Sequence, residues 1–309
     1  MRSAQRRARI EKKKKQNNFY RSLIKILLPV AIILGAFLFV RLNTHFWNGR
    51  DKLTIAYRMD NGDVGVLVMD PLIGELTTLI IPGGTSISVA RGYGTMRIKN
   101  VWQLGINEKV GGSLLAETVT RNFLFPVFLW SDSEAYNLTT GNLVGIIHFV
   151  FSPGVGNIPF GDRLSAGLFA LRVNNLGKSE IDLGRSQFLN KKVLNDGEPG
   201  YVISGPVSQR LTAYFSDNEM ASVSPKIGIV DATGVHGIAE NVGQVLEVMG
   251  GKVVSIDRKV DKEDFGCTVL GRNLDYVKKI SRLFSCKVGS GKTDFDLEID
   301  LGSSFTKIY

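Results

Sequence analysis

The chain has 309 residues, of which 44% are hydrophobic and 22% are charged, with 34 glycines and two cysteines. These proportions are ordinary for a folded protein and exclude a disordered chain, a collagen and a disulfide-dense miniprotein. The net charge of +9 belongs to the first 25 residues, which carry ten basic residues and one acidic residue, because residues 26–309 carry 28 of each. A nucleic-acid-binding protein would have a basic face within its folded body, so this distribution argues against nucleic acid as a partner.

An apolar segment follows the basic tail directly. Residues 26–40 read ILLPVAIILGAFLFV, without a charged or strongly polar side chain. A helix needs about 20 apolar residues to span a bilayer. The segment is long enough if it extends over residues 23–42 and if the charged ends of Lys25 and Arg41 snorkel to the two interfaces. A buried core helix and a cleaved signal peptide are the alternatives. The sequence after Val40 is RLNTHFWNGR, which lacks a small-residue cleavage site, so an uncleaved membrane anchor is favoured.

The charge asymmetry predicts the orientation of this anchor, because basic flanks stay in the cytoplasm. We therefore expect a cytoplasmic tail over residues 1–22, a single transmembrane helix over 23–42 and a short polar stalk over 43–50. The rest of the chain is then extracytoplasmic, and the protein is expected in the cell membrane with its C-terminus outside.

Short apolar runs alternate with turn signals through residues 51–218, which predicts a first outer α/β domain. The expected elements are strands over 52–59, 64–70 and 75–82, an amphipathic helix over 114–125, a buried strand over 143–152 and a short closing helix over 211–215.

A second outer α/β domain is predicted over residues 224–309, where strand and helix patterns alternate. The expected elements are strands over 226–232, 252–257, 267–271, 286–289 and 296–302, and helices over 238–250 and 274–284. They form two strand–helix–strand units. Residues 289–293 read GSGKT, like the end of a nucleotide-binding P-loop, but the required first glycine is replaced by Cys286 and a strand follows, so no nucleotide is expected.

The two cysteines predict a disulfide. Cys267 begins one strand of the second strand–helix–strand unit, and Cys286 begins the strand after its helix. A right-handed crossover places two such strands side by side. The expected compartment is oxidising, so we predict a Cys267–Cys286 bridge, with two buried thiols as the alternative.

The second half of the outer part resembles a known family domain. Residues 230–239 read VDATGVHGIA, a helix and a strand follow, and the chain closes with LEIDLGSSF over 297–305. This order is similar to the LytR C-terminal domain, with Gly302 and Phe305 at its closing positions.

The stretch from Asp63 to Pro126 resembles the LytR-CpsA-Psr domain that usually precedes it. Asp63-Val64, a strand, Asp70-Pro71 and a strand ending in Ile-Pro follow the order of that family. The family motif Ile-Pro-Arg-Asp-Thr is here Ile-Pro-Gly-Gly-Thr, so Gly83 and Gly84 replace the arginine and the aspartate.

A second family motif, Asp-Phe-Gly-Arg, is similar to residues 182–185, which read DLGR. Arg172 lies upstream as a possible partner. Phe188 stands where the family has its next arginine.

The resemblance implies a function at the cell envelope. Active members transfer glycopolymers from polyprenyl pyrophosphate to peptidoglycan with a divalent metal. Arginines hold the pyrophosphate, because a planar guanidinium binds phosphate oxygens bidentately, and carboxylates hold the metal. The resemblance and the altered loop give six candidate ligand-binding residues, with Arg91 and Arg97 as possible replacements for the missing arginine: Asp63, Arg91, Arg97, Arg172, Asp182 and Arg185.

Two hypotheses remain open for the function. The first is a membrane-anchored cell-envelope protein without catalysis and without a cofactor, which binds a polyprenyl-linked or peptidoglycan ligand or another envelope protein. The alternative is an active glycopolymer phosphotransferase that uses an altered pocket and Mg²⁺. A transcription attenuator, suggested by older names in the family, is disfavoured by the neutral outer body and the small cytoplasmic tail.

Overall fold

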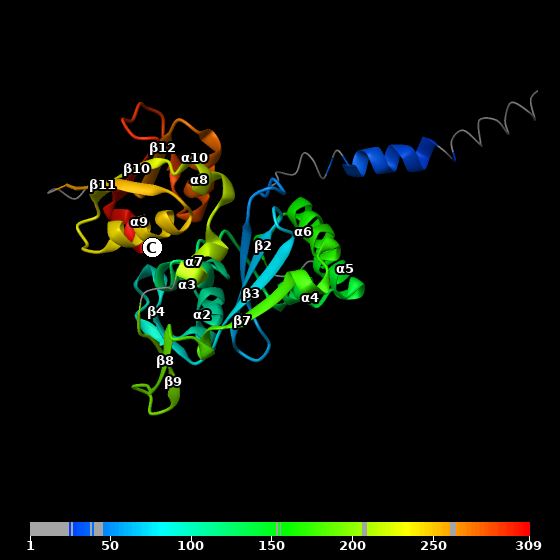
Figure 1. The fold of residues 1–309 in the computed structure, drawn as a ribbon, viewed down its shortest axis with the longest axis horizontal. Helices are drawn as coiled ribbons and strands as arrows, with labels where there is room; N and C mark the ends of the chain where they lie inside the picture. Colours follow the sequence, from blue (N-terminus) through cyan, green and yellow to red (C-terminus); the bar gives the residue numbers. More distant parts are fainter. Residues whose placement is uncertain are drawn as a thin grey trace, which may run out of the picture. The chain divides into compact units, whose positions relative to one another are not determined.

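The computed structural model describes residues 25, 27–37, 39, 46–152, 154, 156–205, 209–259 and 264–309 (Figure 1). The chain divides into two compact units: Met1–Phe46 with Pro159–Gly161, and Trp47–Ile158 with Asp162–Tyr309. The tail predicted over 1–22 lies outside the described residues, and the predicted transmembrane segment is described only in part. Within the described ranges, no helix has both the length and the apolar character needed to cross a membrane.

The second unit is a mixed α/β structure with three sheets. The first sheet has the strand order β6-β1-β2-β3-β7. Its strands are β1 (Leu53–Arg58), β2 (Val64–Asp70), β3 (Glu75–Ile81), β6 (Leu129–Ser131) and β7 (Lys178–Asp182). β1, β2 and β3 pair antiparallel, whereas β6 pairs parallel with β1 and β7 pairs parallel with β3. The strands predicted over 52–59, 64–70 and 75–82 are therefore confirmed.

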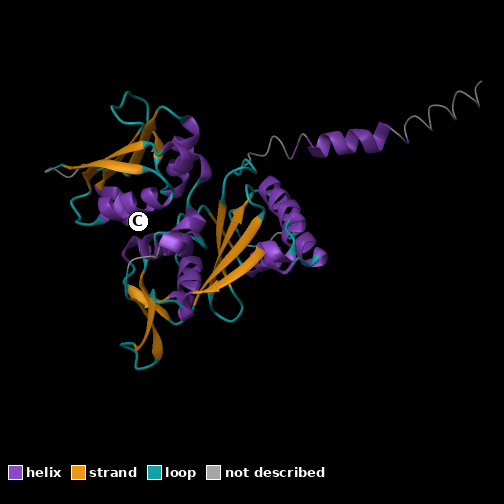
Figure 2. Ribbon diagram, in the orientation of Figure 1, coloured by secondary structure: helices purple, strands orange, loops and turns teal. Residues whose placement is uncertain are grey.

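Helices cover both faces of this sheet, which explains why every residue of β2 is buried. α2 and α3 lie on one side, and α4, α5 and α6 lie on the other (Figures 1 and 2). Their bounds are α2 (Val101–Asn107), α3 (Ser113–Phe123), α4 (Asn137–Thr140), α5 (Leu143–Phe151) and α6 (Phe160–Arg172). α3 confirms the predicted amphipathic helix and buries Leu115, Val119 and Phe123 against the sheet.

The buried strand predicted over 143–152 is wrong, because this segment forms α5. A continuous apolar run does not distinguish a strand from a buried helix. Here the Asn142 side chain accepts a hydrogen bond from the amide of Val144 at 3.0 Å and begins a helix. The helix buries Ile146, Phe149 and Val150, three and four positions apart, so its burial follows the helical period.

A second, smaller sheet has the order β5-β4-β9-β8 and was not predicted. Its strands are β4 (Thr85–Ser88), β5 (Thr95–Arg97), β8 (Leu189–Val193) and β9 (Pro199–Ile203). Two helices follow, α7 (Gln209–Phe215) and α8 (Asn218–Val223). α7 confirms the short helix expected over 211–215. Single turns of 3₁₀ helix are η1 (Ala90–Gly92), η2 (Ile98–Asn100), η3 (Ser133–Tyr136), η4 (Asn175–Gly177), η5 (Leu183–Arg185) and η6 (Ser303–Lys307).

The third sheet has the order β11-β10-β14-β12-β13. It is built from β10 (Lys226–Ala232), β11 (Lys252–Arg258), β12 (Cys267–Gly271), β13 (Lys287–Val288) and β14 (Leu297–Gly302), with helices α9 (Ile238–Val248) and α10 (Leu274–Leu283). β10 pairs parallel with β11, and β12 pairs parallel with β13. Both predicted strand–helix–strand units are therefore present.

The strand pairing in this sheet brings the two cysteines together. Thr268 pairs with Lys287, so Cys267 and Cys286 precede two paired residues by one position each. Their Cα atoms lie 4.7 Å apart and their sulfur atoms are bonded. This separation falls within the range that a disulfide bridges.

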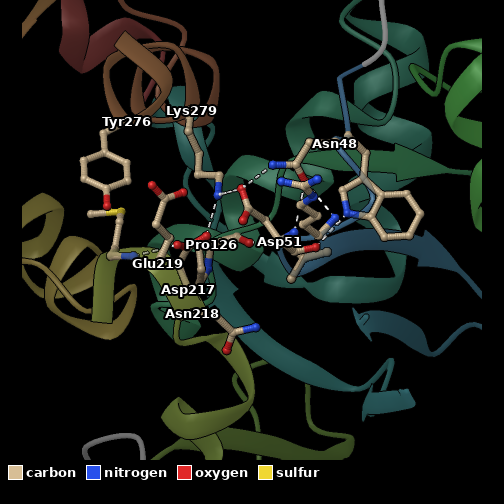
Figure 3. A network of polar contacts seen from close by, with 12 residues as sticks. Asn48, Asp51, Pro126, Asp217, Asn218, Glu219, Tyr276 and Lys279 are labelled. Atoms are coloured by element: carbon tan, nitrogen blue, oxygen red, sulfur yellow. Dashed lines mark hydrogen bonds and ion pairs between the residues drawn. The ribbon is translucent and has the colours of Figure 1, made fainter. Parts of the chain in front are cut away.

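Side chains also join the parts of the second unit that the sequence assigns to separate domains. Lys279 of α10 forms ion pairs with Asp51, which precedes β1, and with Asp217, which caps α8 (Figure 3). The Arg121 guanidinium of α3 donates a hydrogen bond to the carbonyl of Tyr309 at 2.7 Å. The domain limits at 218 and 224 stay predictions.

Candidate functional site

The two motifs that resemble the LytR-CpsA-Psr family meet at one edge of the first sheet. β3 and β7 run parallel, and Ile80 pairs with Asp182 near their carboxyl ends. The loop after β3 therefore lies beside η5, which follows β7. A β-carbon built at Gly184 would stand 2.8 Å from Pro82 Cγ, which shows how closely the two loops approach.

Asp63 reaches the same loop from the turn between β1 and β2. Its Oδ1 accepts a hydrogen bond from the amide of Gly83 at 2.7 Å, and its Oδ2 accepts one from the Asn61 side chain at 2.8 Å. The structure thus brings together Asp63, the altered Gly83-Gly84 loop and Asp182. Both oxygens of Asp63 are engaged in holding the turn and the loop together.

Gly83 is required by this close approach. A β-carbon at Gly83 would stand 2.3 Å from the carbonyl oxygen of Gly62, which is fixed backbone. Because such a contact is shorter than packed atoms allow, no side chain fits at position 83 without movement of the turn. A glycine at position 83 is therefore needed for the close approach of the two turns.

Arg97 of β5 lies beside the other glycine of the loop. A β-carbon at Gly84 would stand 3.2 Å from Arg97 Nη1. The guanidinium is held by Asp196, with Nε to Oδ2 at 2.6 Å and Nη2 to Oδ1 at 2.8 Å. It also donates to the carbonyls of Pro199 at 3.0 Å and Glu198 at 3.2 Å. These bonds occupy most of its donors and oppose its charge with a carboxylate.

The Arg97–Asp196 pair also shapes the charge state of both groups. The hydrogen bond from Arg97, with a further one from the Glu198 amide, lowers the pKa of Asp196 to about 2. The same bond raises the pKa of Arg97. A pocket of about 330 Å³ borders the pair, and its wall includes Arg97, Asp196, Lys192 and Asn195.

Arg91 is held in a different direction, toward α3. Its Nε and Nη2 donate to the two carboxylate oxygens of Glu117, each at 2.6 Å. Burial raises the pKa of Glu117, while the bonds from Arg91 oppose that effect; the bond to Glu117 raises the pKa of Arg91. Arg91 adopts φ of 62°, the left-handed region that non-glycine residues rarely occupy, so the backbone at this turn is strained.

The remaining candidates are divided between the ends of β7. Asp182 accepts a hydrogen bond from the Gly184 amide at 2.8 Å, and Arg185 Nε lies 3.2 Å from Asp182 Oδ2. The Arg185 side chain is 88% exposed, so it faces solvent beside the altered loop. Arg172 ends α6 and precedes the amino end of β7. The structure therefore brings Asp63, Arg97, Asp182 and Arg185 to one edge and places Arg172 elsewhere.

The carboxylates at this edge do not fit a divalent-cation site in this arrangement. Asp63 accepts hydrogen bonds at both oxygens, and Asp182 is engaged by a backbone amide and by Arg185. Across the described part of the chain, no group of three or more His, Cys, Asp or Glu side chains is placed to hold a metal ion.

Sequence reasoning missed the two acids that neutralise the candidate arginines. Glu117 lies within the helix predicted over 114–125, where its polar character indicates only an outward-facing position. Asp196 belongs to an Asn-Asp-Gly turn over 195–197, a pattern that predicts a turn and nothing about its partner. No sequence signal connects it with Arg97, 99 residues earlier.

Comparison of the whole fold finds similar solved structures. TagT of Bacillus subtilis shares 11% identity with a TM-score of 0.37, over 52% of this chain and 88% of TagT. TagV of Bacillus subtilis shares 10% identity with a TM-score of 0.37, over 51% of this chain and 92% of TagV. A LytR-CPS2A-Psr family protein, YwtF (TagT), with bound octaprenyl pyrophosphate lipid shares 12% identity with a TM-score of 0.34, over 52% of this chain and 87% of that protein.

No family model matches this chain, and no curated protein matches it. Similarities of 10–12% identity with TM-scores below 0.5 establish neither a family nor an activity for the chain.

Proposed function

We propose that this chain is a membrane-anchored protein of the cell envelope, related to the LytR-CpsA-Psr proteins, that binds a polyprenyl-linked or peptidoglycan ligand, or an envelope partner, without transferring it. The support comes from the basic tail and apolar segment, from the two family-like motifs that meet beside β3 and β7, and from the state of the arginines near the altered loop.

The observation that carries the non-catalytic part is the pairing of Arg97 with Asp196. A phosphotransferase needs guanidinium donors aimed at the oxygens where negative charge develops. Arg97 directs two of its nitrogens at a carboxylate, and a third nitrogen at a backbone carbonyl. Arg91 is bound to Glu117 through two further bonds. A pyrophosphate would have to displace these acids before either arginine could hold it.

One observation favours the alternative, an active phosphotransferase. Arg97 approaches Gly84. This glycine lies in the loop that corresponds to the Arg-Asp pair of the LytR-CpsA-Psr motif. If a bound ligand displaced Asp196, the guanidinium would stand beside that loop. This alternative needs Mg²⁺ in the family mechanism, and the engaged carboxylates of Asp63 and Asp182 do not provide its site.

A transfer assay separates the two. The purified full chain in detergent is incubated with a polyprenyl-pyrophosphate-linked glycopolymer, peptidoglycan and Mg²⁺, and both binding and transfer are measured. Binding of the donor without transfer supports the proposal. Turnover that is lost in Arg97→Ala, but kept in Arg210→Ala at an exposed position of α7, would replace the proposal with the alternative.

The anchor and its orientation need their own experiment. A C-terminal alkaline phosphatase fusion of the full chain should be active, and a C-terminal green fluorescent protein fusion exported by the general secretory route should be dark. The reverse pattern would place the C-terminus in the cytoplasm and reject the envelope assignment.

A further inference from the structure

The stalk that follows the apolar segment is fixed to the folded body from Trp47 onward. The Trp47 amide donates to Asp162 Oδ1 at 3.1 Å, and the Trp47 ring packs edge-on against Phe169 of α6 with centroids 6.0 Å apart. Its Nε1 donates to the carbonyl of Asp51 at 2.7 Å, which folds the stalk back on itself. Trp47 is only 6% exposed, so this attachment is part of the core.

Little free chain remains between the apolar segment and this attachment. The predicted segment ends at Leu42, and residues 43–46 are the only ones before Trp47. An extended chain covers at most about 3.6 Å per residue, so the distance between Leu42 and Trp47 cannot exceed about 18 Å. A bilayer around residues 23–42 would therefore be close to the part of the body that holds Trp47.

The turn between β2 and β3 is at this same end of the first sheet. β1 begins where β2 ends, because the two strands are antiparallel with Leu53 opposite Met69. Lys52 Nζ lies 3.1 Å from Asp70 Oδ2, and Asp70 accepts a hydrogen bond from the Leu72 amide. The residue before β1 and the beginning of the β2–β3 turn are thus joined through an ion pair.

Two loops present large apolar side chains to solvent at this end. Leu72 and Ile73 of the β2–β3 turn are 72% and 60% exposed, and Leu176 of η4 is 96% exposed. A β-carbon at Gly177 would stand 2.8 Å from the carbonyl oxygen of Gly74, so η4 lies against the turn. We name these three side chains, Leu72, Ile73 and Leu176, the apolar tip.

We propose that the apolar tip inserts into the outer leaflet of the bilayer and holds the outer body against the membrane. Single exposed apolar residues are common, so exposure alone does not distinguish the tip; its three side chains are grouped on two neighbouring loops, as in an interaction surface. A lipid surface is the occupant that the chain itself supplies, because the tip lies at the end of the sheet where the body is tethered to the apolar segment. The inference rests on the proposed anchor.

The disulfide makes a clean labelling experiment possible. Both native cysteines are bonded to each other, so a single new cysteine is the one thiol open to an environment-sensitive fluorescent maleimide. The full chain is reconstituted in vesicles with and without phospholipids that carry nitroxide quenchers on their acyl chains. The variants Leu72→Cys, Ile73→Cys and Leu176→Cys report on the apolar tip, and circular dichroism checks that each is folded.

Matched controls use apolar residues with similar exposure elsewhere. Val193→Cys on β8 and Val288→Cys on β13 replace side chains that are 64% and 54% exposed. Ile33→Cys, within the apolar segment, reports on the anchor itself. The expected result is a blue-shifted, strongly quenched label at the three tip positions and at Ile33, with an unquenched label at Val193 and Val288.

The other outcomes are decisive. Quenching at Ile33 without quenching at the tip overturns the inference and leaves the anchor in place. Equal quenching at the tip and at Val193 and Val288 also overturns it, because the contact would not be specific. Quenching at the tip without quenching at Ile33 supports tip insertion but rejects the anchor, and no quenching anywhere rejects both.

Discussion

The guanidinium of Arg97 lies against Gly84, with Nη1 3.2 Å from the position that a β-carbon at Gly84 would take. The Gly83-Gly84 loop, which lacks the arginine of the LytR-CpsA-Psr motif, therefore has the side chain of Arg97 from β5 beside it. That arginine is bound to Asp196, so the positive charge next to the loop is opposed. We therefore expect any phosphate binding at this edge of the sheet to be opposed by the Asp196 carboxylate.

Asp196→Asn should increase the affinity for inorganic pyrophosphate several-fold. The substitution keeps the shape of the side chain but removes the charge that opposes Arg97, so the guanidinium can turn to a phosphate group. Asp294→Asn is the matched control, because it removes the same charge from an exposed position in the loop before β14. Calorimetric titration of both variants is the measurement, and equal affinities would show that the Asp196 charge does not limit pyrophosphate binding.

Mild acid should not release Arg97. The pKa of Asp196 is lowered to about 2 by its hydrogen bonds, whereas an aspartate in an unfolded chain has a pKa near 3.9. The pair therefore contributes fully to stability above about pH 4 and loses its contribution as the pH falls toward 2. The chemical shift of the Asp196 carboxyl carbon, followed from pH 7 to pH 2, should stay constant until about pH 3, and a midpoint above pH 4 would contradict the pairing.

Gly83→Ala and Gly84→Ala should differ in stability although they are neighbours. The first places a β-carbon 2.3 Å from the Gly62 carbonyl, and the second places one 3.2 Å from the flexible Arg97 side chain. We expect Gly83→Ala to lower the free energy of unfolding by about 1–3 kcal/mol, as overpacking does. Gly84→Ala should change it by less than about 0.5 kcal/mol. Urea unfolding of both variants tests this, and equal losses would refute the close approach of the two turns.

The elements that the sequence predicted correctly are those with a clear period and clear ends. β1 to β3 are short apolar runs separated by Asn-Gly and Pro-to-Gly turns, and α9 and α10 have apolar side chains at helical spacing. α5 was predicted as a strand because its nine residues are apolar on every side except for His148. The small sheet escaped prediction because β8 is largely exposed and lacks alternation.

The candidate site was predictable only as far as local motifs reach. Asp63 and the Gly83-Gly84 loop are near in sequence and lie together. The pairs Arg97–Asp196 and Arg91–Glu117 depend on tertiary packing between separate elements. Pairing of this kind leaves no periodic pattern, so the charge of each arginine was visible in the sequence but its neutralisation was not.

Non-reducing mass spectrometry of the full chain should show no free thiol, since the structure joins Cys267 and Cys286. The bridge closes a loop with a sequence separation of 19. Its removal in a Cys267→Ser/Cys286→Ser variant should lower the stability of the region by roughly 3 kcal/mol in the chain-entropy account. Two alkylated cysteines in protein purified without reductant would contradict the bridge.

Lys279→Met should weaken the contact between α10 and the segments that carry Asp51 and Asp217. The ammonium lies 2.6 Å from Asp51 Oδ2 and also binds Asp217, and these side chains are 16%, 16% and 5% exposed. Removing the lysine leaves two carboxylates without their cation, which we expect to cost about 3 kcal/mol, the lower end for a buried pair. Lys278→Met, one position away and exposed, is the control.

The pH dependence of this contact has a definite sign. Burial lowers the pKa of Lys279, but the charges and hydrogen bonds of Asp217 and Asp51 outweigh it and raise the pKa above its usual value. A raised lysine pKa contributes stability fully below the unfolded value near 10.4 and loses it as the pH rises through the folded value. The contact of Lys279 with Asp51 and Asp217 should therefore be insensitive to pH between about 6 and 9 and should be lost only in stronger alkali.

Hydrogen exchange of the α8 and α10 amides should be faster in Lys279→Met than in Lys278→Met, and adding Asp51→Asn to Lys279→Met should restore part of the protection. Equal exchange in the two single variants would show that Lys279 does not hold these segments together.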